Sequence, residues 1–167
     1  MASMSAEPDE VDRLVAAWTH ERPDLDVSPM QVMSRVARLA HHLDRARRRA
    51  FAEHGLEPWE FDVLSALRKA GEPYALSPGR LVQETLVTSG TMTNRVDRLA
   101  TRGFVERLPD PSDRRGVQVR LTPAGRTAVD GALTELVEHE KELLAELNDD
   151  SADVLVDALR VLARRFA

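Results

Sequence analysis

The chain has 167 residues and 43% hydrophobic residues, enough for one domain's worth of core, and its formal net charge of −5 does not by itself favour a nucleic-acid partner. It contains no cysteine, which excludes disulfides, thiolate metal sites and thiol-based redox sensing. No segment approaches the roughly 20 apolar residues of a membrane span, and the acidic N-terminus lacks the basic start of a signal peptide. We therefore expect a cytoplasmic, nucleoid-associated protein without a membrane partner.

Helices account for most of the predicted elements. Residues 1–9 are expected to form a disordered tail, and a first helix is expected over residues 10–20. Four later segments begin with a residue followed by proline, which suits the first position of a helix. These segments predict helices over 29–54, 58–70, 78–84 and 123–147, and a last helix is expected over 151–166. The helix over 58–70 is expected to bury Phe61, Leu64 and Leu67 and to end at Gly71.

The most informative segment begins with a helical pattern over residues 89–103. Its apolar positions, such as Val96 and Leu99, can face a core, while its polar positions lie on the opposite side. Ser89 is the expected N-cap, and Gly103 is the expected C-terminal stop. The short helix that precedes this one makes the pair a helix-turn-helix, in which the helix over residues 89–103 is the recognition helix.

A hairpin pattern follows directly. Residues 104–108 and 117–121 alternate in polarity, as half-exposed strands do, and they flank a turn-rich tip, DPSDRRG, with two adjacent arginines. A helix sized for the major groove followed by a basic-tipped hairpin is the layout of a winged helix-turn-helix. We therefore predict a mainly α fold with a small β-wing that binds double-stranded DNA.

The local charge supports this prediction better than the total charge does. Residues 89–126 hold eight arginines against four acids, whereas residues 127–167 hold ten acids against four bases. Phosphate attraction decays over about 8 Å at physiological salt, so the local face decides whether DNA is attracted.

The terminal helices carry apolar stripes that have no evident partner within a small winged-helix core. Such stripes usually mark an interface, and a homodimer would place two recognition helices about 34 Å apart on a palindromic operator. The alternative is that these helices pack within one chain. We expect N-terminal helices for dimerisation and the wall of a ligand cleft over 10–54, a DNA-binding lobe over 55–121 and C-terminal dimerisation helices over 122–167.

Over residues 29–166 the chain resembles the MarR family of transcriptional regulators. The resemblance rests on the order of the elements, the DPSDRRG tip and the LTPAGR junction between strand and helix. It implies that Arg114 enters the minor groove, where a narrow groove concentrates negative potential, and that Asp113 and Arg115 hold the tip. The recognition-helix contacts to bases and phosphates are then expected from Ser89, Thr91, Thr93, Asn94 and Arg98.

A second resemblance concerns the N-terminus. The additional helix with Trp18, followed by ERPDLDVSPM, is similar to the urate-responsive, PecS-like branch of that family. The resemblance implies a ligand site at Trp18, Asp62 and Arg95, and a coupling role for Arg107 at the base of the wing. An indole can stack on a purine, arginine can pair with an anionic oxygen, and a carboxylate can accept from a ring N–H. The alternatives are that Trp18 anchors the helix, that Asp62 forms a structural ion pair and that Arg95 contacts phosphate.

The resulting expectation is a dimeric repressor released from a palindromic operator by a small anionic aromatic ligand such as urate, without a cofactor or catalytic site. The alternative is a MarR-type DNA-binding protein without urate response, which uses another phenolic ligand, is modulated by a metal or has an architectural role. A helical dimeric adaptor would leave the arginine-tipped wing unexplained. A zinc site at histidines such as His41 and His42 remains a minor alternative.

Overall fold

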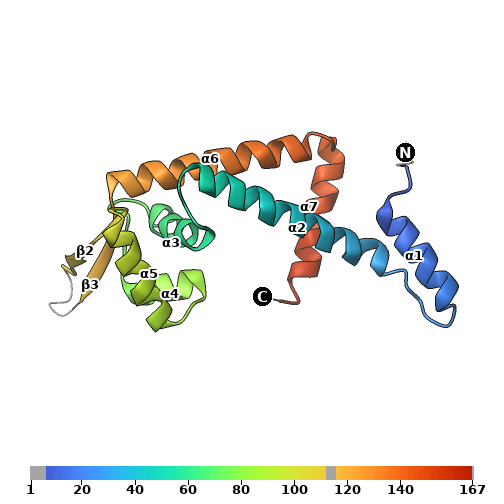
Figure 1. Cartoon of the computed structure of the whole chain (residues 1–167), viewed down its shortest axis with the longest axis horizontal. Coiled ribbons are helices and arrows are strands. Elements are labelled where there is room, and N and C mark those ends of the chain that lie inside the picture. Colours follow the sequence, from blue (N-terminus) through green and yellow to red (C-terminus); the bar gives the residue numbers. More distant parts are fainter. Residues whose placement is uncertain (1–6, 112–115, 167) are drawn as a thin grey trace. The chain divides into compact units, whose positions relative to one another are not determined.

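The computed structural model describes residues 7–111 and 116–166 and shows a mainly helical chain with a small antiparallel sheet (Figure 1). The described elements are α1 (Glu10–Glu21), α2 (Met30–Glu53), α3 (Pro58–Lys69), β1 (Ala75–Leu76), α4 (Pro78–Thr85), α5 (Ser89–Thr101), β2 (Val105–Pro109), β3 (Val117–Leu121), α6 (Pro123–Leu144) and α7 (Asp149–Ala163). The predicted fold class, a mainly α protein with a small β-wing, is confirmed. Most of the expected disordered tail, residues 1–6, lies outside the described residues.

The chain divides into two compact units, Met1–Ala46 and Arg47–Ala167, with the boundary inside α2. In the first unit α1 is attached to α2 through charged side chains. Asp9 caps α1 by accepting from the backbone N–H groups of Val11 (2.7 Å) and Asp12 (3.0 Å), and it also pairs with Arg35 (2.8 Å). The hydrogen bond from the Asp12 backbone and the Arg35 guanidinium lower the pKa of Asp9 to about 2, so its carboxylate stays charged at a lower pH than that of an ordinary aspartate.

The core of the second unit is built around the helices of the predicted helix-turn-helix. Phe51 at the end of α2 stacks on Phe61 of α3, with ring centroids 4.0 Å apart. The predicted burial of Phe61, Leu64 and Leu67 is confirmed. Helices α3, α4 and α5 pack around this core next to the sheet (Figure 1).

Proline at the first position starts α3, α4 and α6, as predicted from the sequence. The fourth predicted start, at Pro29, lies one residue before the beginning of α2 at Met30. The predicted N-cap of α5 was wrong by one residue. Thr88 is the cap, because its Oγ1 accepts from the backbone N–H of Thr91 (3.3 Å), and Ser89 is the first helical residue. Gly103 follows the C-terminal end of α5 with a φ of +74°, which places it in the left-handed region that ends helices.

The turn between α4 and α5 contains an unusual residue. Leu86 has a φ of +54°, and 92% of its surface is exposed. A left-handed conformation is strained for a residue with a Cβ, and an exposed leucine gains no packing in return. The turn of the helix-turn-helix therefore presents an apolar side chain to solvent.

The sheet has the order β1-β3-β2, and both pairings are antiparallel. β2 and β3 form the predicted hairpin, with Arg107 opposite Val119. β1 was not predicted, because a strand of two residues is too short to show alternation. At the base of the hairpin, Thr122 caps α6 by accepting from the N–H of Gly125 (3.1 Å).

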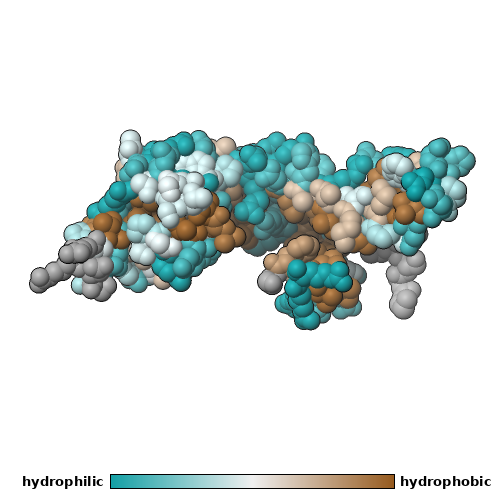
Figure 2. All heavy atoms as spheres, turned by 90° about the horizontal axis from the view of Figure 1, so that it is seen from below, coloured by the Kyte–Doolittle hydropathy of each residue, from teal (hydrophilic) through white to brown (hydrophobic). Residues whose placement is uncertain are grey.

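Large apolar side chains remain exposed on several helices. α7 has no buried residue, and its leucines and valines, among them Leu155 and Leu159, are between 39% and 69% exposed. Figure 2 shows that hydrophobic residues reach the surface instead of being fully covered. Within the described ranges, no helix has the length and apolar character needed to span a membrane.

Candidate nucleic-acid interface

Helix α5 separates its polar residues from its apolar ones. The apolar face is buried and consists of Met92, Val96 and Leu99. The expected DNA-contacting residues of the helix are all exposed: Ser89, Thr91, Thr93, Asn94 and Arg98. The packing of the buried face holds the helix in place, so the polar face is a rigid surface of the size that enters a major groove.

The side chains on this face differ in whether they already form hydrogen bonds within the protein. The Thr91 hydroxyl lies 2.9 Å from that of Thr88, and Thr93 Oγ1 donates to the Ser89 carbonyl at 3.1 Å. Among the described residues, the Asn94 amide has no hydrogen-bond partner. Asn94 is therefore the side chain of this face that is most readily available to a base edge, where its amide can bond an adenine in two places.

The base of the wing is connected to the recognition helix. Arg107 of β2 pairs with Asp97 of α5 at 2.7 Å, and Arg120 of β3 pairs with Glu106 of β2 at 2.7 Å. The first pair crosses between the two parts that would contact DNA, so a displacement of α5 also acts on the wing. The expected tip residues Asp113, Arg114 and Arg115 lie outside the described residues.

One arginine in the basic segment has a structural role. Arg102 pairs with Glu60, which is only 1% exposed, and donates to the carbonyl of Gly55 at 2.7 Å. Its guanidinium also lies 4.6 Å from the centroid of the Phe104 ring. Arg102 thereby neutralises a buried carboxylate and joins the end of α5 to the start of α3, so it is not one of the free positive charges that the sequence count includes.

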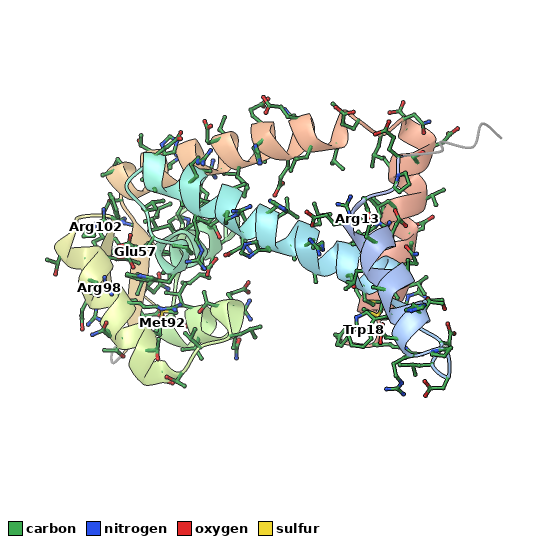
Figure 3. The ribbon with its side chains drawn as sticks, turned by 45° about the vertical axis from the view of Figure 1, so that its right-hand side comes forward. Arg13, Trp18, Glu57, Met92, Arg98 and Arg102 are labelled. Carbon is green, nitrogen blue, oxygen red and sulfur yellow. The ribbon has the colours of Figure 1, made fainter. Side chains whose placement is uncertain are left out.

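A cluster around Trp59 was missed in the sequence. The guanidinium carbon of Arg98 lies 4.6 Å from the centroid of the Trp59 ring, and that of Arg95 lies 5.5 Å from it. Glu57 accepts from the indole N–H and lies 3.6 Å from Arg98. Figure 3 labels Glu57 and Arg98. Glu57 and Trp59 lie more than 30 positions before Arg95 and Arg98 in the chain, and no local pattern of the sequence reveals pairings over such a separation.

The cluster borders a hollow of about 480 Å³ on the face of the molecule that carries the recognition helix. The hollow is lined by Trp59, Gly90, Thr91, Asn94, Arg95 and Arg98. Two guanidinium groups and several hydrogen-bonding side chains make it a concave surface suited to an anion.

The three expected ligand residues fall in different units. Trp18 belongs to α1 of the first unit and is 44% exposed, whereas Asp62 and Arg95 belong to the second unit. Asp62 is exposed, and the described residues offer its carboxylate no hydrogen bond or ion pair. Arg95 is half-buried, and its guanidinium lies over Trp59.

The histidines do not gather into a metal site in the part of the chain that the structure describes. No group of three or more His, Cys, Asp or Glu side chains there is arranged to hold a metal ion. His42 Nδ1 instead lies 2.7 Å from the guanidinium of Arg45. The adjacent rings of His41 and His42 meet edge to face, with centroids 6.1 Å apart.

Comparison with known proteins agrees with this geometry. A family model described as "MarR family" matches residues 54–116. The HTH-type transcriptional regulator PecS of Dickeya dadantii (strain 3937) is 38% identical over 141 residues, which cover 84% of this chain and 85% of PecS.

Two solved structures connect the fold with DNA. The structure of Bordetella bronchiseptica BpsR, whose DNA binding is regulated by 6-hydroxynicotinic acid, has a TM-score of 0.65 and 27% identity and covers 83% of this chain and 97% of BpsR. A mutant of Escherichia coli MarR complexed with operator DNA has a TM-score of 0.59 and 28% identity and covers 83% of this chain and 99% of that one. These relatives are DNA-binding transcriptional regulators and not enzymes, in agreement with the expectation from the sequence. With 38% identity to PecS over most of both chains, the chain belongs to the MarR family of winged helix-turn-helix transcriptional regulators.

Proposed function

We propose that this transcriptional regulator is a homodimeric repressor that reads a palindromic operator with α5 and the wing. The observation that carries the proposal is the exposed polar face of α5, held in place by a fully buried opposite face. The operator complex of the related MarR supports the same use of the fold. In this proposal Asn94 reads a base edge, Arg98 contacts phosphate and Arg114 enters the minor groove, while Asp113 and Arg115 hold the tip of the wing.

Fluorescence anisotropy on the DNA upstream of the gene, with scrambled DNA as competitor, tests this part. A repressor should prefer its operator by about 10³ or more, whereas an architectural protein should show much less preference. Asn94→Ala should reduce the preference for the operator, because it removes about 1–3 kcal/mol of discrimination at the base that Asn94 reads. Arg98→Gln should instead weaken binding to all sequences about equally. A wild-type chain that binds both DNAs equally would reject the repressor.

The ligand that releases the operator is proposed to be a small anionic aromatic molecule, with urate as the first candidate. Asp62 offers a carboxylate without a partner among the described residues, and Arg95 offers a guanidinium that lies over the Trp59 ring but has no ion pair there. Asp62 follows Trp59 by three positions on α3, so the two side chains are neighbours on the helix surface. The similarity to PecS and the regulation of BpsR by an aromatic acid support this ligand class.

Release would follow from the position of Arg95 within the recognition helix. A ligand that draws this guanidinium away changes the surface offered to DNA, and the Arg107–Asp97 pair passes the change to the wing. Such coupling is reciprocal, so bound DNA must weaken ligand binding by the same factor.

Titration of the operator complex with urate at fixed salt tests the ligand. Trp18→Leu and Asp62→Asn should each keep operator affinity but lose release, because neither residue lies on α5. If urate releases either variant from the operator at the concentration that releases the wild type, that residue does not belong to the ligand site. A wild-type complex indifferent to urate would leave the regulator in place and favour another phenolic ligand, a metal or an architectural role.

A further inference from the structure

We propose that Trp59 is a positioning residue for DNA binding: its ring holds Arg95 and Arg98 so that the hollow beside them receives a backbone phosphate of the operator. This inference rests on the proposed role of α5 and extends it to a residue of α3. It assigns a function to the hollow of about 480 Å³ that is lined by Trp59 at the start of α3 and by residues of α5 between Gly90 and Arg98.

The geometry places both arginines of α5 on the same indole. Arg98 and Arg95 lie 4.6 and 5.5 Å from the ring centroid, within the range in which a cation is attracted by the π face. Trp59 is itself half-buried against the core, so it offers a fixed support to two long side chains.

Contact with the ring leaves the arginines competent to bind phosphate. A guanidinium that lies on a ring keeps its N–H donors in its own plane, where they remain available to phosphate oxygens. An arginine side chain that is free in solution loses rotamer entropy when it is immobilised. Contact with the Trp59 ring already restricts the rotamers of both arginines before DNA binds. A phosphate that enters the hollow therefore binds a partly ordered pair of charges.

Glu57 gives the same cluster an opposing charge. Its carboxylate accepts from the indole N–H, which fixes the ring, and lies 3.6 Å from Arg98. The pair is exposed, with 55% and 59% of the two side chains accessible, and therefore weak. An incoming phosphate competes with Glu57 for Arg98, so Glu57 lowers the affinity for any DNA that lacks further contacts.

The occupant favoured by these groups is a phosphate of the DNA backbone. Two cations, a threonine and an asparagine line the hollow, and the residues that provide them lie on the surface proposed to face the duplex. Phosphate contacts fix the register of a protein on DNA, and Trp59, by supporting Arg95 and Arg98 from α3, would help to set the angle at which α5 enters the groove.

Substitutions of Trp59 and Glu57 test the inference in the full-length chain. Operator affinity is measured by anisotropy at several salt concentrations, with scrambled DNA alongside. Trp59→Leu should weaken operator binding about fivefold and lower the slope of log Kd against log salt by about one, whereas Trp59→Phe should stay within about twofold of the wild type. Glu57→Gln should tighten binding to both DNAs about twofold to threefold, because the amide still accepts from the indole but no longer competes with phosphate.

A double-mutant comparison separates positioning from a general loss of fold. In the Arg95→Gln/Arg98→Gln background, Trp59→Leu should have no further effect on affinity or salt slope, since the side chains through which it acts are absent. Lys69→Gln, at the other end of α3, controls for the loss of a positive charge and should leave the affinity within about twofold.

Three results would overturn the inference: Trp59→Leu with wild-type affinity and slope, Trp59→Phe as weak as Trp59→Leu, or an undiminished Trp59 effect in the double-arginine background. If Trp59→Leu does not fold, as judged by circular dichroism, Trp59→Phe and Glu57→Gln still decide the matter, and a Glu57→Gln variant that does not bind more tightly would refute the competition. Loss of operator preference in the wild-type chain would instead contradict the proposed function itself.

Discussion

At Gly125 the structure leaves no space for a side chain. A Cβ built there would lie 2.1 Å from the carbonyl oxygen of Phe104 and 2.9 Å from its carbonyl carbon. That oxygen accepts from the N–H of Thr122 at 3.0 Å, so the backbone cannot withdraw without losing a hydrogen bond at the base of the wing. The glycine in the LTPAGR junction therefore has a packing reason to be there.

Gly125→Ala should lower the free energy of unfolding by about 2 kcal/mol, because the methyl group collides with backbone atoms. Urea denaturation followed by circular dichroism at one fixed protein concentration measures the change. Gly79→Ala in α4 is the matched control, since its Cβ would meet only Ser77 Oγ at 4.0 Å. That control should be neutral or stabilising by about 0.5 kcal/mol. Equal effects of the two substitutions would contradict the close approach.

Individual residues also show what the sequence could and could not predict. The exposed set on α5 was predictable because helical periodicity assigns each position to a face. The role of Arg102 was not, since its pairing with Glu60 joins residues that are 42 positions apart. Charge counting treated all eight arginines of the basic segment as equal. Arg102, however, pairs with the buried carboxylate of Glu60 and is not available to DNA, and no local pattern of the sequence shows this burial.

At the scale of elements, α1 depends on charged contacts with α2. Asp9 and Asp12 both pair with Arg35, at 2.8 and 3.0 Å, and Val11 is the one buried residue of α1. The pKa of Asp9 is lowered to about 2 from an ordinary value of 3.8. A lowered pKa means that the stabilising contribution of Asp9 is fully present above about pH 4 and is lost as the pH falls towards 2.

We therefore expect α1 to detach from α2 between about pH 4 and pH 2. Emission from Trp18, recorded in a Trp59→Phe variant so that it is the remaining tryptophan, should shift to longer wavelength over this range. Asp9→Asn should show the shifted emission already at pH 7. Asp24→Asn is the control, because Asp24 pairs with Arg22 in the following loop and not with α2. An Asp9→Asn spectrum identical to the wild type at pH 7 would contradict this account.

The elements themselves were largely predictable because particular residue types mark where helices begin and end. Proline at the first position of α3, α4 and α6 and glycine after α3 and α5 place the boundaries within a few residues. The cap of α5 was misplaced because Thr88 and Ser89 are both good caps, and only backbone conformation distinguishes them. β1 escaped prediction because its two residues gain their strand character from β3, which is more than 40 positions away.

At the scale of the whole molecule, exposed apolar helices point to association. α7 buries none of its own residues, and Leu155, Leu159 and Leu162 recur at the spacing of one helix face with about 40% of each exposed. Leu159→Glu should convert a dimer into a monomer, because it places a charge in an apolar interface. Size-exclusion chromatography with light scattering measures the mass, with Arg160→Gln, on the same helix and already exposed, as the control.

The same Leu159→Glu variant should bind the operator on the order of 100-fold more weakly, since a monomer engages one half-site and loses the benefit of the linked second site. Unchanged mass and affinity would mean that α7 does not contribute to the interface. A monomer with wild-type affinity would separate dimerisation from DNA recognition and contradict the reading of a palindrome.

The exposed turn at Leu86 gives the molecule a further experimental use. The chain has no cysteine, so a Leu86→Cys variant would carry a single thiol on a side chain that is almost wholly accessible. A spin label or dye attached there would sit beside the recognition helix without background from other sites. In a dimer the two labels would form a symmetric pair, and their separation would report directly on the spacing that the protein presents to successive major grooves.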